Sequence, residues 1–278
     1  TAFSMESITW FTSLLADGKK TDIRLEAAMA KLFCTEEAWK IADDAMQIRG
    51  GRGYETADSL RGRGEAPIPV ERTLRDLRIN RILEGSSEIM KLFIAREAMD
   101  RHVSLLFPLL SPKTSFGEKL KALACALRFY ILWYPGQWFY LKKTPKKSSV
   151  PKKLMPHFKF VAKTAHRLAR DLFHAMLWYR EKLEKRQRVL FRLVDTGCEL
   201  FAIATSLARA VLLYSANPSD RTPLDLADAF AREAKKRIAG SMRQVFANDD
   251  RADYKLARQV LDGKFLWLEE GIIPAKRP

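Results

Sequence analysis

Residues 47–54 have the sequence QIRGGRGY, a glycine-rich segment that separates two runs of helical periodicity. In the run before it, apolar residues recur at helical spacing over residues 21–48, which predicts a long amphipathic helix. The three glycines should end that helix, because glycine adopts the backbone conformations that close a helix at its C-terminus. A shorter helix is predicted over residues 4–16, and residues 49–70 should form a loop rich in glycine and arginine.

Two further segments follow the glycine-rich one. Residues 69–79, with the sequence PVERTLRDLRI, have the spacing of a short helix over 70–79, and the pair Glu84-Gly85 should interrupt the helical pattern. The sequence SSE at residues 86–88 is typical of a helix N-terminus. Serine hydroxyls can cap free backbone N–H groups there, and a carboxylate is favoured at the positive end of the helix dipole. The next helix should therefore begin at this point.

The remainder of the chain has helical patterns and no alternation typical of strands. These patterns lie at residues 116–134, 157–186, 188–215, 223–247 and 251–268. The sequence therefore predicts an all-α fold made of two helical bundles. We expect a first helical domain at residues 1–105, a linker at residues 106–117 and an accessory helical domain at residues 118–278.

Composition excludes several classes of protein. A chain of 278 residues with 47% hydrophobic residues is too apolar to be disordered. Its three cysteines are far apart, which suits a reducing compartment, and its four histidines do not pair with them as zinc ligands would. No metal site is predicted. We find no N-terminal signal peptide and no uncharged apolar stretch of about 20 residues that would span a membrane.

The formal net charge of +16 is concentrated in one segment. Residues 119–170 contain 13 Lys and Arg and no Asp or Glu. Within them, seven aromatic residues at 129–140 precede six lysines at 142–153. Aromatic rings favour the headgroup boundary of a membrane, and clustered lysines attract anionic lipids. Residues 129–153 therefore indicate a contact with an anionic membrane surface.

Two other interpretations of this segment stay open. Its aromatic residues can pack in a helical core while its lysines are solvated. A basic run with aromatic residues can also bind single-stranded nucleic acid by stacking, although no recognised nucleic-acid module accompanies it, so nucleic acid is not expected. Pro135-Gly136 should break a membrane-spanning helix, so we expect the segment to lie on a surface.

The three segments at 47–54, 69–79 and 81–89, taken in this order on helices, resemble the C-terminal domain of the acyl-CoA dehydrogenase flavoenzymes. The signature of that domain is a Gln-x-x-Gly-Gly-x-Gly turn, a Pro-Val-Glu-Arg-x-x-Arg-Asp helix and a Glu-Gly-(Thr/Ser)-x-(Glu/Gln)-Ile junction. The resemblance covers residues 1–102. The residues beyond it are similar in arrangement to the extra C-terminal domain of very-long-chain members, which binds the membrane.

The resemblance implies FAD as cofactor, acyl-CoA as substrate, a homodimer and an electron-transferring flavoprotein as electron acceptor. Glu84 would be the catalytic base, in apolar surroundings that Ile82, Leu83, Ile89 and Met90 could supply. The substrate contacts that it implies are Gly85 and Arg96. The cofactor contacts are Ser86, Ser87 and Glu88 for one FAD, and Gln47, Ile48, Arg49, Gly50 and Gly51 for the FAD of a neighbouring subunit.

Two departures from the family pattern shape our expectations. The loop between Tyr54 and Pro69 is longer than in the common pattern. The two domains that precede this one in the family, and the first helix of this domain, are also missing from the chain. We expect an incomplete first domain, the C-terminal portion of an enzyme of long-chain fatty-acid β-oxidation. It should lie in the cytoplasm or an organelle matrix, peripherally on the inner face of a membrane. The alternative is a non-catalytic scaffold for dimerisation or membrane docking.

Overall fold

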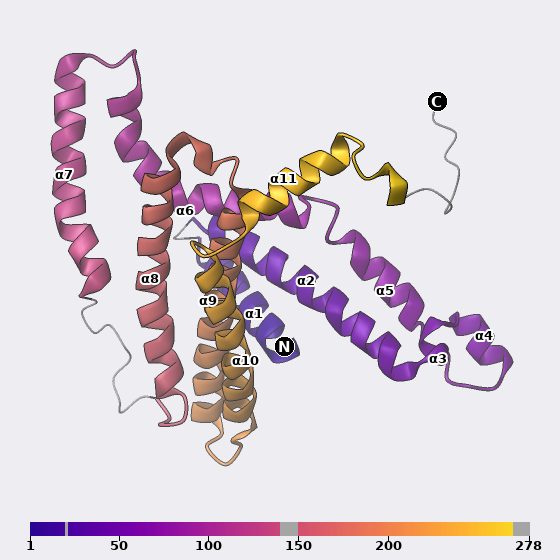
Figure 1. The fold of residues 1–278 in the computed structure, drawn as a ribbon. Helices are drawn as coiled ribbons and strands as arrows, with labels where there is room; N and C mark the ends of the chain where they lie inside the picture. The colour runs from indigo at the N-terminus through magenta and orange to yellow at the C-terminus, as the bar shows by residue number, and fades with distance from the viewer. Residues whose placement is uncertain (20–21, 140–149, 269–278) are drawn as a thin grey trace.

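The computed structural model describes residues 1–19, 22–139 and 150–268, and in these ranges all regular secondary structure is helical (Figure 1). The all-α prediction is therefore confirmed. The first five helices are α1 (Ala2–Gly18), α2 (Arg24–Arg49), α3 (Gly51–Tyr54), α4 (Ala57–Gly62) and α5 (Val70–Ile79). They are followed by α6 (Ser87–Leu110), α7 (Phe116–Trp138), α8 (Met155–Tyr179), α9 (Gln187–Ala216), α10 (Thr222–Gln244) and α11 (Asp250–Leu261), with short 3-10 helices at Arg180–Leu183 and Leu266–Leu268.

The predicted linker at residues 106–117 is helical at both of its ends. Helix α6 continues to Leu110, with Pro108 inside its last turn, and α7 already begins at Phe116. A proline near the end of a helix removes only one backbone donor, so the helix does not have to stop there. The start of α7 is fixed by a capping box, in which Ser115 and Glu118 each accept a hydrogen bond from the backbone N–H of the other.

The segment predicted as a loop at residues 49–70 contains α3 and α4. Leu60 in α4 is fully buried, and Thr56 caps α4 by accepting a hydrogen bond from Ser59 N at 3.2 Å. Ion pairs then close the segment on itself: Arg52 lies 2.6 Å from Glu65, and Arg63 lies 2.9 Å from Glu55. Because the longer loop supplies its own buried residue and its own charge partners, it folds instead of staying open.

Pro135-Gly136 does not interrupt α7, contrary to our expectation. The helix runs on to Trp138, and the backbone N–H of Phe139 still donates to Pro135 O at 3.0 Å. The side chain of Gln137 adds a hydrogen bond from its Nε2 to the carbonyl oxygen of Trp133 at 3.1 Å. This side-chain bond supports the last turn of the helix.

The aromatic residues of α7 divide between its two faces. Phe129, Tyr130, Trp133 and Tyr134 are half-buried against His102 of α6 and Phe173 of α8, with ring centroids 4.8 Å apart for His102 and Trp133. The packed-core interpretation is therefore right for these four. Trp138 and Phe139 are exposed, and Arg170 lies over the Trp138 ring at 3.7 Å. Tyr140, Lys142, Lys143, Lys146 and Lys147 lie outside the described residues.

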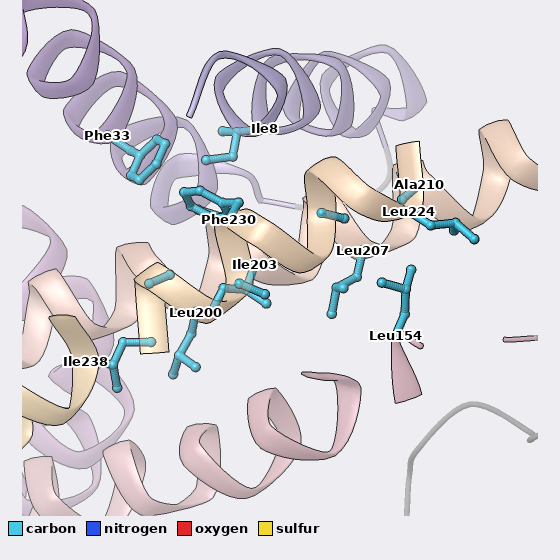
Figure 2. Close-up of a cluster of buried hydrophobic side chains, with 14 of the residues drawn as sticks. Ile8, Phe33, Leu154, Leu200, Ile203, Leu207, Ala210, Leu224, Phe230 and Ile238 are labelled. Carbon is cyan, nitrogen blue, oxygen red and sulfur yellow. The ribbon is translucent and has the colours of Figure 1, made fainter. Parts of the chain in front are cut away.

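Helix α9 is the central element of the fold, with α1, α2, α6, α8 and α10 packed around it. Its side chains form one apolar cluster with residues of α10 and of the beginning of the chain (Figure 2). The cluster contains Ile8 of α1, Phe33 of α2, Ile203 and Leu207 of α9, and Phe230 of α10. Helices on both sides of the predicted linker thus share a core. The domain bounds themselves stay a prediction.

In the described ranges, α9 is the one helix whose length and composition would also let it cross a membrane. Half of its most apolar window is buried inside the protein. A core helix of this length passes the same test, and its burial accounts for the apolar composition of α9.

Candidate functional site

The turn between α5 and α6 carries Glu84 in a backbone conformation that is unusual for its residue type. Glu84 has φ +54° and Gly85 has φ +96°, so both lie in the left-handed region. For a residue with a Cβ atom this conformation costs roughly 1–2 kcal/mol. Such strain persists only where surrounding contacts hold it, and it clusters at functional sites.

The side chain of Glu84 is exposed, and so are the apolar residues beside it. Ile82, Leu83 and Ile89 form an open apolar rim around the turn, and Met90 is half-buried. A Cβ atom on Gly85 would lie 2.7 Å from the Met90 sulfur, so the glycine permits the close approach of that side chain. The apolar surroundings expected for Glu84 are therefore present in this chain as a rim, and they do not enclose the carboxylate.

A side chain of helix α2 holds the turn by hydrogen bonds to its backbone. Lys31 Nζ donates to the carbonyl oxygen of Gly85 at 2.6 Å and to that of Leu83 at 3.3 Å. These two carbonyl groups flank Glu84 in the chain. One ammonium group on α2 thus bonds the backbone on both sides of the predicted base.

A second set of contacts holds the ends of the turn. Arg81 Nε donates to Glu36 at 2.8 Å, and the Arg81 guanidinium lies 4.8 Å from the centre of the Trp39 ring. The Ser87 hydroxyl donates to the same Glu36 carboxylate. Burial alone would raise the pKa of Glu36, but the hydrogen bonds from Ser87 and Arg81 outweigh it and keep that pKa below its usual value.

The predicted cofactor contacts at the start of α6 differ in their exposure and in their hydrogen-bond partners. Ser86 caps the helix by accepting a hydrogen bond from Ile89 N at 3.5 Å, and Glu88 is exposed in the first turn. Ser87 is buried and its hydroxyl is bonded to Glu36, so it faces α2 instead of the open end of the helix. Arg96 is exposed further along α6.

The second predicted cofactor segment, residues 47–51, ends α2. Gln47, Gly50 and Gly51 are exposed, and Ile48 is 85% exposed. Gly50 has φ +57°, and a Cβ atom there would meet nothing within 4 Å. Another molecule can therefore approach the Gly50 backbone. Arg49 is half-buried, and its Nε has no hydrogen-bond partner among the described residues. The segment thus combines an open backbone at Gly50 with a buried donor on Arg49.

The two predicted cofactor segments do not meet in this chain. The Glu84 turn contacts α2 at Lys31, and residue 47 lies near the end of the same helix. Because an α-helix rises by 1.5 Å per residue, the two places are about 24 Å apart along α2. A groove of about 700 Å³ lies between α2 and α5 and is lined by Trp39, Met46, Tyr54, Leu74, Arg78 and Ile82.

Sequence reasoning missed the three residues of α2 that support the turn, namely Lys31, Glu36 and Trp39. Their contacts with Arg81 and Gly85 join residues that are 42 to 54 positions apart in the chain, so local patterns do not reveal them. The available signal is weak: a lysine, an acid and a tryptophan share one side of a helix that also buries Leu32 and Phe33.

Two family models match the chain. The model described as "Acyl-CoA dehydrogenase, C-terminal domain" matches residues 4–99. The model described as "ACAD9/ACADV, C-terminal domain" matches residues 152–263. The first match contains the Glu84 turn and both predicted cofactor segments, and the second covers α8 to α11.

Curated relatives and a solved structure agree with these matches. "Probable acyl-CoA dehydrogenase FadE10" from Mycobacterium bovis is 43% identical over 98% of this chain and 42% of the relative. The mitochondrial very long-chain specific acyl-CoA dehydrogenase of Bos taurus is 29% identical over 85% of this chain and 34% of the relative. The crystal structure of a Bacillus anthracis acyl-CoA dehydrogenase complexed with FAD has a similar fold, with a TM-score of 0.62 and 19% identity over 92% of this chain and 42% of that one. The chain thus spans less than half the length of these proteins.

Proposed function

The chain belongs to the acyl-CoA dehydrogenase family, and we propose that it works as the C-terminal portion of an FAD-dependent acyl-CoA dehydrogenase. The observation that carries this proposal is the Glu84 turn. Glu84 has φ +54°, and Lys31 of α2 donates hydrogen bonds to the backbone before and after it. Its carboxylate lies at an open apolar rim. A strained, well-supported acidic residue of this kind suits a base that must be aimed at one atom of a substrate.

In the proposed reaction, Glu84 removes the proton from the α-carbon of the acyl-CoA thioester. A bound FAD would supply the acceptor for the hydride that leaves the β-carbon, so that a double bond forms between the two carbons. The Glu84 carboxylate takes up the proton and becomes a carboxylic acid. Ile82, Leu83 and Ile89 would exclude water from that carboxylate once the rest of the enzyme covers the rim, and loss of water strengthens a carboxylate as a base. We also propose Gly85 at the turn and Arg96 on α6 as substrate contacts.

The residues present fit FAD at two places. At the start of α6, Ser86 and Glu88 can bind the hydroxyl groups of the cofactor, and the free N–H groups of the helix suit an anion. At the end of α2, Gly50 leaves its backbone open, and the buried Arg49 Nε has no hydrogen-bond partner in the part of the chain that the structure describes. The Ser87 hydroxyl donates its hydrogen bond to Glu36, so only its oxygen lone pairs are left for a cofactor contact.

The separation of these two places supports a dimer. Two segments about 24 Å apart along one helix suit contacts to two different cofactor molecules. We therefore propose that residues 47–51 approach the FAD of a second subunit in a homodimer. We also propose an electron-transferring flavoprotein as electron acceptor and a place in fatty-acid β-oxidation. The similarity to the very long-chain relatives supports long acyl chains as substrates.

The assignment of Glu84 is tested in the full-length protein that contains this chain. The Glu84→Gln variant should bind flavin normally and lose turnover by a factor of about 10³ or more, because the amide cannot accept the proton. The matched control is Glu184→Gln, an exposed acid beyond α8, which should leave turnover unchanged. Ordinary turnover in Glu84→Gln would contradict the proposal and favour a non-catalytic scaffold.

We further propose that α7 contacts an anionic membrane surface with its outer face, which makes the protein peripheral to a membrane. This face is a row of exposed apolar side chains with Lys121 and Arg128 exposed beside it. Amphipathic helices of this kind bind in the plane of the membrane interface. The row consists of Phe116, Leu120, Leu123, Leu127 and Ile131. The support comes from this row, since four of the aromatic residues first considered pack inward.

A further inference from the structure

We infer that Lys31 is the positioning residue for Glu84: its ammonium group holds the turn in the conformation that aims the carboxylate. This inference rests on the proposed function, in which Glu84 is the base. It concerns a residue of α2 that lies more than 50 positions away from Glu84 in the sequence.

The contact geometry brackets Glu84. Lys31 Nζ lies 2.6 Å from the carbonyl oxygen of Gly85 and 3.3 Å from that of Leu83. With the Leu83 and Gly85 carbonyl groups bonded to one ammonium group, the backbone is held at both ends of the segment that runs from the Leu83–Glu84 peptide through Glu84 to the Gly85–Ser86 peptide. The direction of the Glu84 side chain is then set by the position of Lys31.

Lys31 is itself held by a rigid element. Its neighbours Leu32 and Phe33 are buried and belong to the two apolar clusters of the protein. Because α2 is fixed in the core, the Lys31 ammonium group is held at a constant position beside the turn. Arg81 and Ser87, which bond Glu36, hold the flanks of the turn, but their side chains do not bond the two carbonyl groups beside Glu84.

The left-handed backbone conformation at Glu84 explains why the two hydrogen bonds from Lys31 are needed. A residue with a Cβ atom leaves this conformation readily unless surrounding contacts keep it there. Carbonyl groups in a turn also lack the partners that a helix would give them, and a charged donor satisfies them strongly. Without Lys31, the turn can relax and the carboxylate moves away from the α-carbon. A displacement of about 1 Å at a reacting group can cost a factor of 10² in rate.

The test uses the full-length flavin-loaded enzyme with three variants. Lys31→Met removes the charge and both hydrogen bonds, and we expect kcat to fall by a factor of about 10 to 100 while KM and flavin content stay within twofold of wild type. Lys31→Arg keeps the charge and can donate to two carbonyl groups, so it should recover most of the lost kcat. Lys40→Met removes an exposed lysine of the same helix that pairs with Glu37 and should leave kcat unchanged.

A second readout separates positioning from a general structural role. With substrate deuterated at the α-carbon, the isotope effect on kcat should be larger in Lys31→Met than in wild type, because proton removal becomes more strongly rate-limiting. The inference is overturned if kcat in Lys31→Met stays within twofold of wild type. It is also overturned if the loss of activity is explained by flavin loss alone, with an unchanged rate per bound flavin. If Lys31→Met does not fold, Lys31→Gln takes its place under the same criteria.

The Glu84→Gln variant is measured in the same assay. If it retains turnover, the proposed function fails, whatever the result for Lys31. If it loses turnover while Lys31→Met stays active, the proposed function stands and the positioning role of Lys31 is wrong. The two failures are therefore distinguishable.

Discussion

Arg192 in α9 and Asp250 at the start of α11 form a two-point ion pair, with nitrogen–oxygen distances of 2.6 and 2.7 Å. The pair is nearly shielded from solvent, since the two side chains are 13% and 10% exposed. In Figure 1, α11 projects away from the bundle beyond this point. The hydrogen bonds from Arg192 keep the pKa of Asp250 below its usual value. The pair therefore ties the base of α11 to the central helix.

The first prediction concerns this pair. Asp250→Asn leaves the Arg192 guanidinium without its charge partner in a shielded place and should lower the free energy of unfolding by about 3 kcal/mol. Urea denaturation followed by circular dichroism measures the loss. Asp253→Asn is the matched control, because Asp253 pairs with Arg188 at 2.5 Å but is 54% exposed, so its loss should be much smaller. Equal losses in the two variants would contradict the anchoring role of Asp250.

The second prediction concerns the glycines that follow α2. A Cβ atom on Gly53 would lie 2.6 Å from the backbone oxygen of Met46, and backbone cannot move aside as a side chain can. Gly53→Ala should therefore lower the free energy of unfolding by about 1–3 kcal/mol. At Gly51 a Cβ atom would meet nothing within 4 Å, so Gly51→Ala should be neutral or slightly stabilising. Thermal melting of the two variants side by side gives the comparison, and a neutral Gly53→Ala would refute it.

The third prediction concerns the pH dependence that His102 contributes. Burial, and to a smaller extent the charge of Arg101, lower the pKa of His102, whose Nδ1 lies 2.9 Å from the Tyr130 hydroxyl. The unfolded chain therefore binds a proton at this site more readily than the folded chain. The stability that the neutral imidazole contributes is present above its ordinary pKa and is lost as the pH falls through the lowered value.

The variant His102→Phe isolates this contribution. The free energy of unfolding in urea, measured at pH 7.5 and pH 5.5, should differ less in His102→Phe than in wild type. Tyr130→Phe is the control: it removes the hydrogen bond, which costs about 1 kcal/mol, and keeps the titrating imidazole. A pH dependence of wild-type size in His102→Phe would show that other groups produce it.

The fourth prediction concerns the outer face of α7. The double variant Leu127→Gln/Ile131→Gln should bind vesicles of anionic lipid more weakly than wild type in sedimentation, because two exposed apolar contacts are lost. The double variant Leu212→Gln/Leu226→Gln changes exposed leucines on α9 and α10 and should bind as wild type does. If wild type does not bind anionic vesicles at moderate salt, the membrane proposal is wrong.

The elements that local signals define could be predicted from the sequence. The bounds of α5, the end of α2 in the glycine segment and the start of α6 after Ser86 follow from spacing and capping residues. The face of α7 that packs inward could not, because both its sides are apolar: Tyr130 and Trp133 lie on one, Leu127 and Ile131 on the other. Which side is buried depends on His102 and Phe173, and these come from other helices.

In the candidate site too, local motifs are visible in the sequence and contacts between helices are not. Glu84 and Gly85 stand out in the sequence because a short motif places them between two helices. Their support by Lys31, Glu36 and Trp39 depends on how α2 crosses the turn, which no local pattern encodes. Ser87 is an example: its place in the motif indicates a cofactor contact, but the motif does not reveal that its hydroxyl also donates a hydrogen bond to Glu36.

The cluster that joins Ile8 and Phe33 to Leu207 and Phe230 has a consequence for the synthesis of the chain. The first helices emerge from the ribosome roughly 200 residues before their partners in α9 and α10. At 5–20 residues per second, that interval is on the order of 10 to 40 seconds. Through it the apolar side chains of α1 and α2 lack the surface that will cover them. During this interval a nascent chain of this protein exposes that apolar surface, and the core shared by its first helices can close only after translation has passed α10.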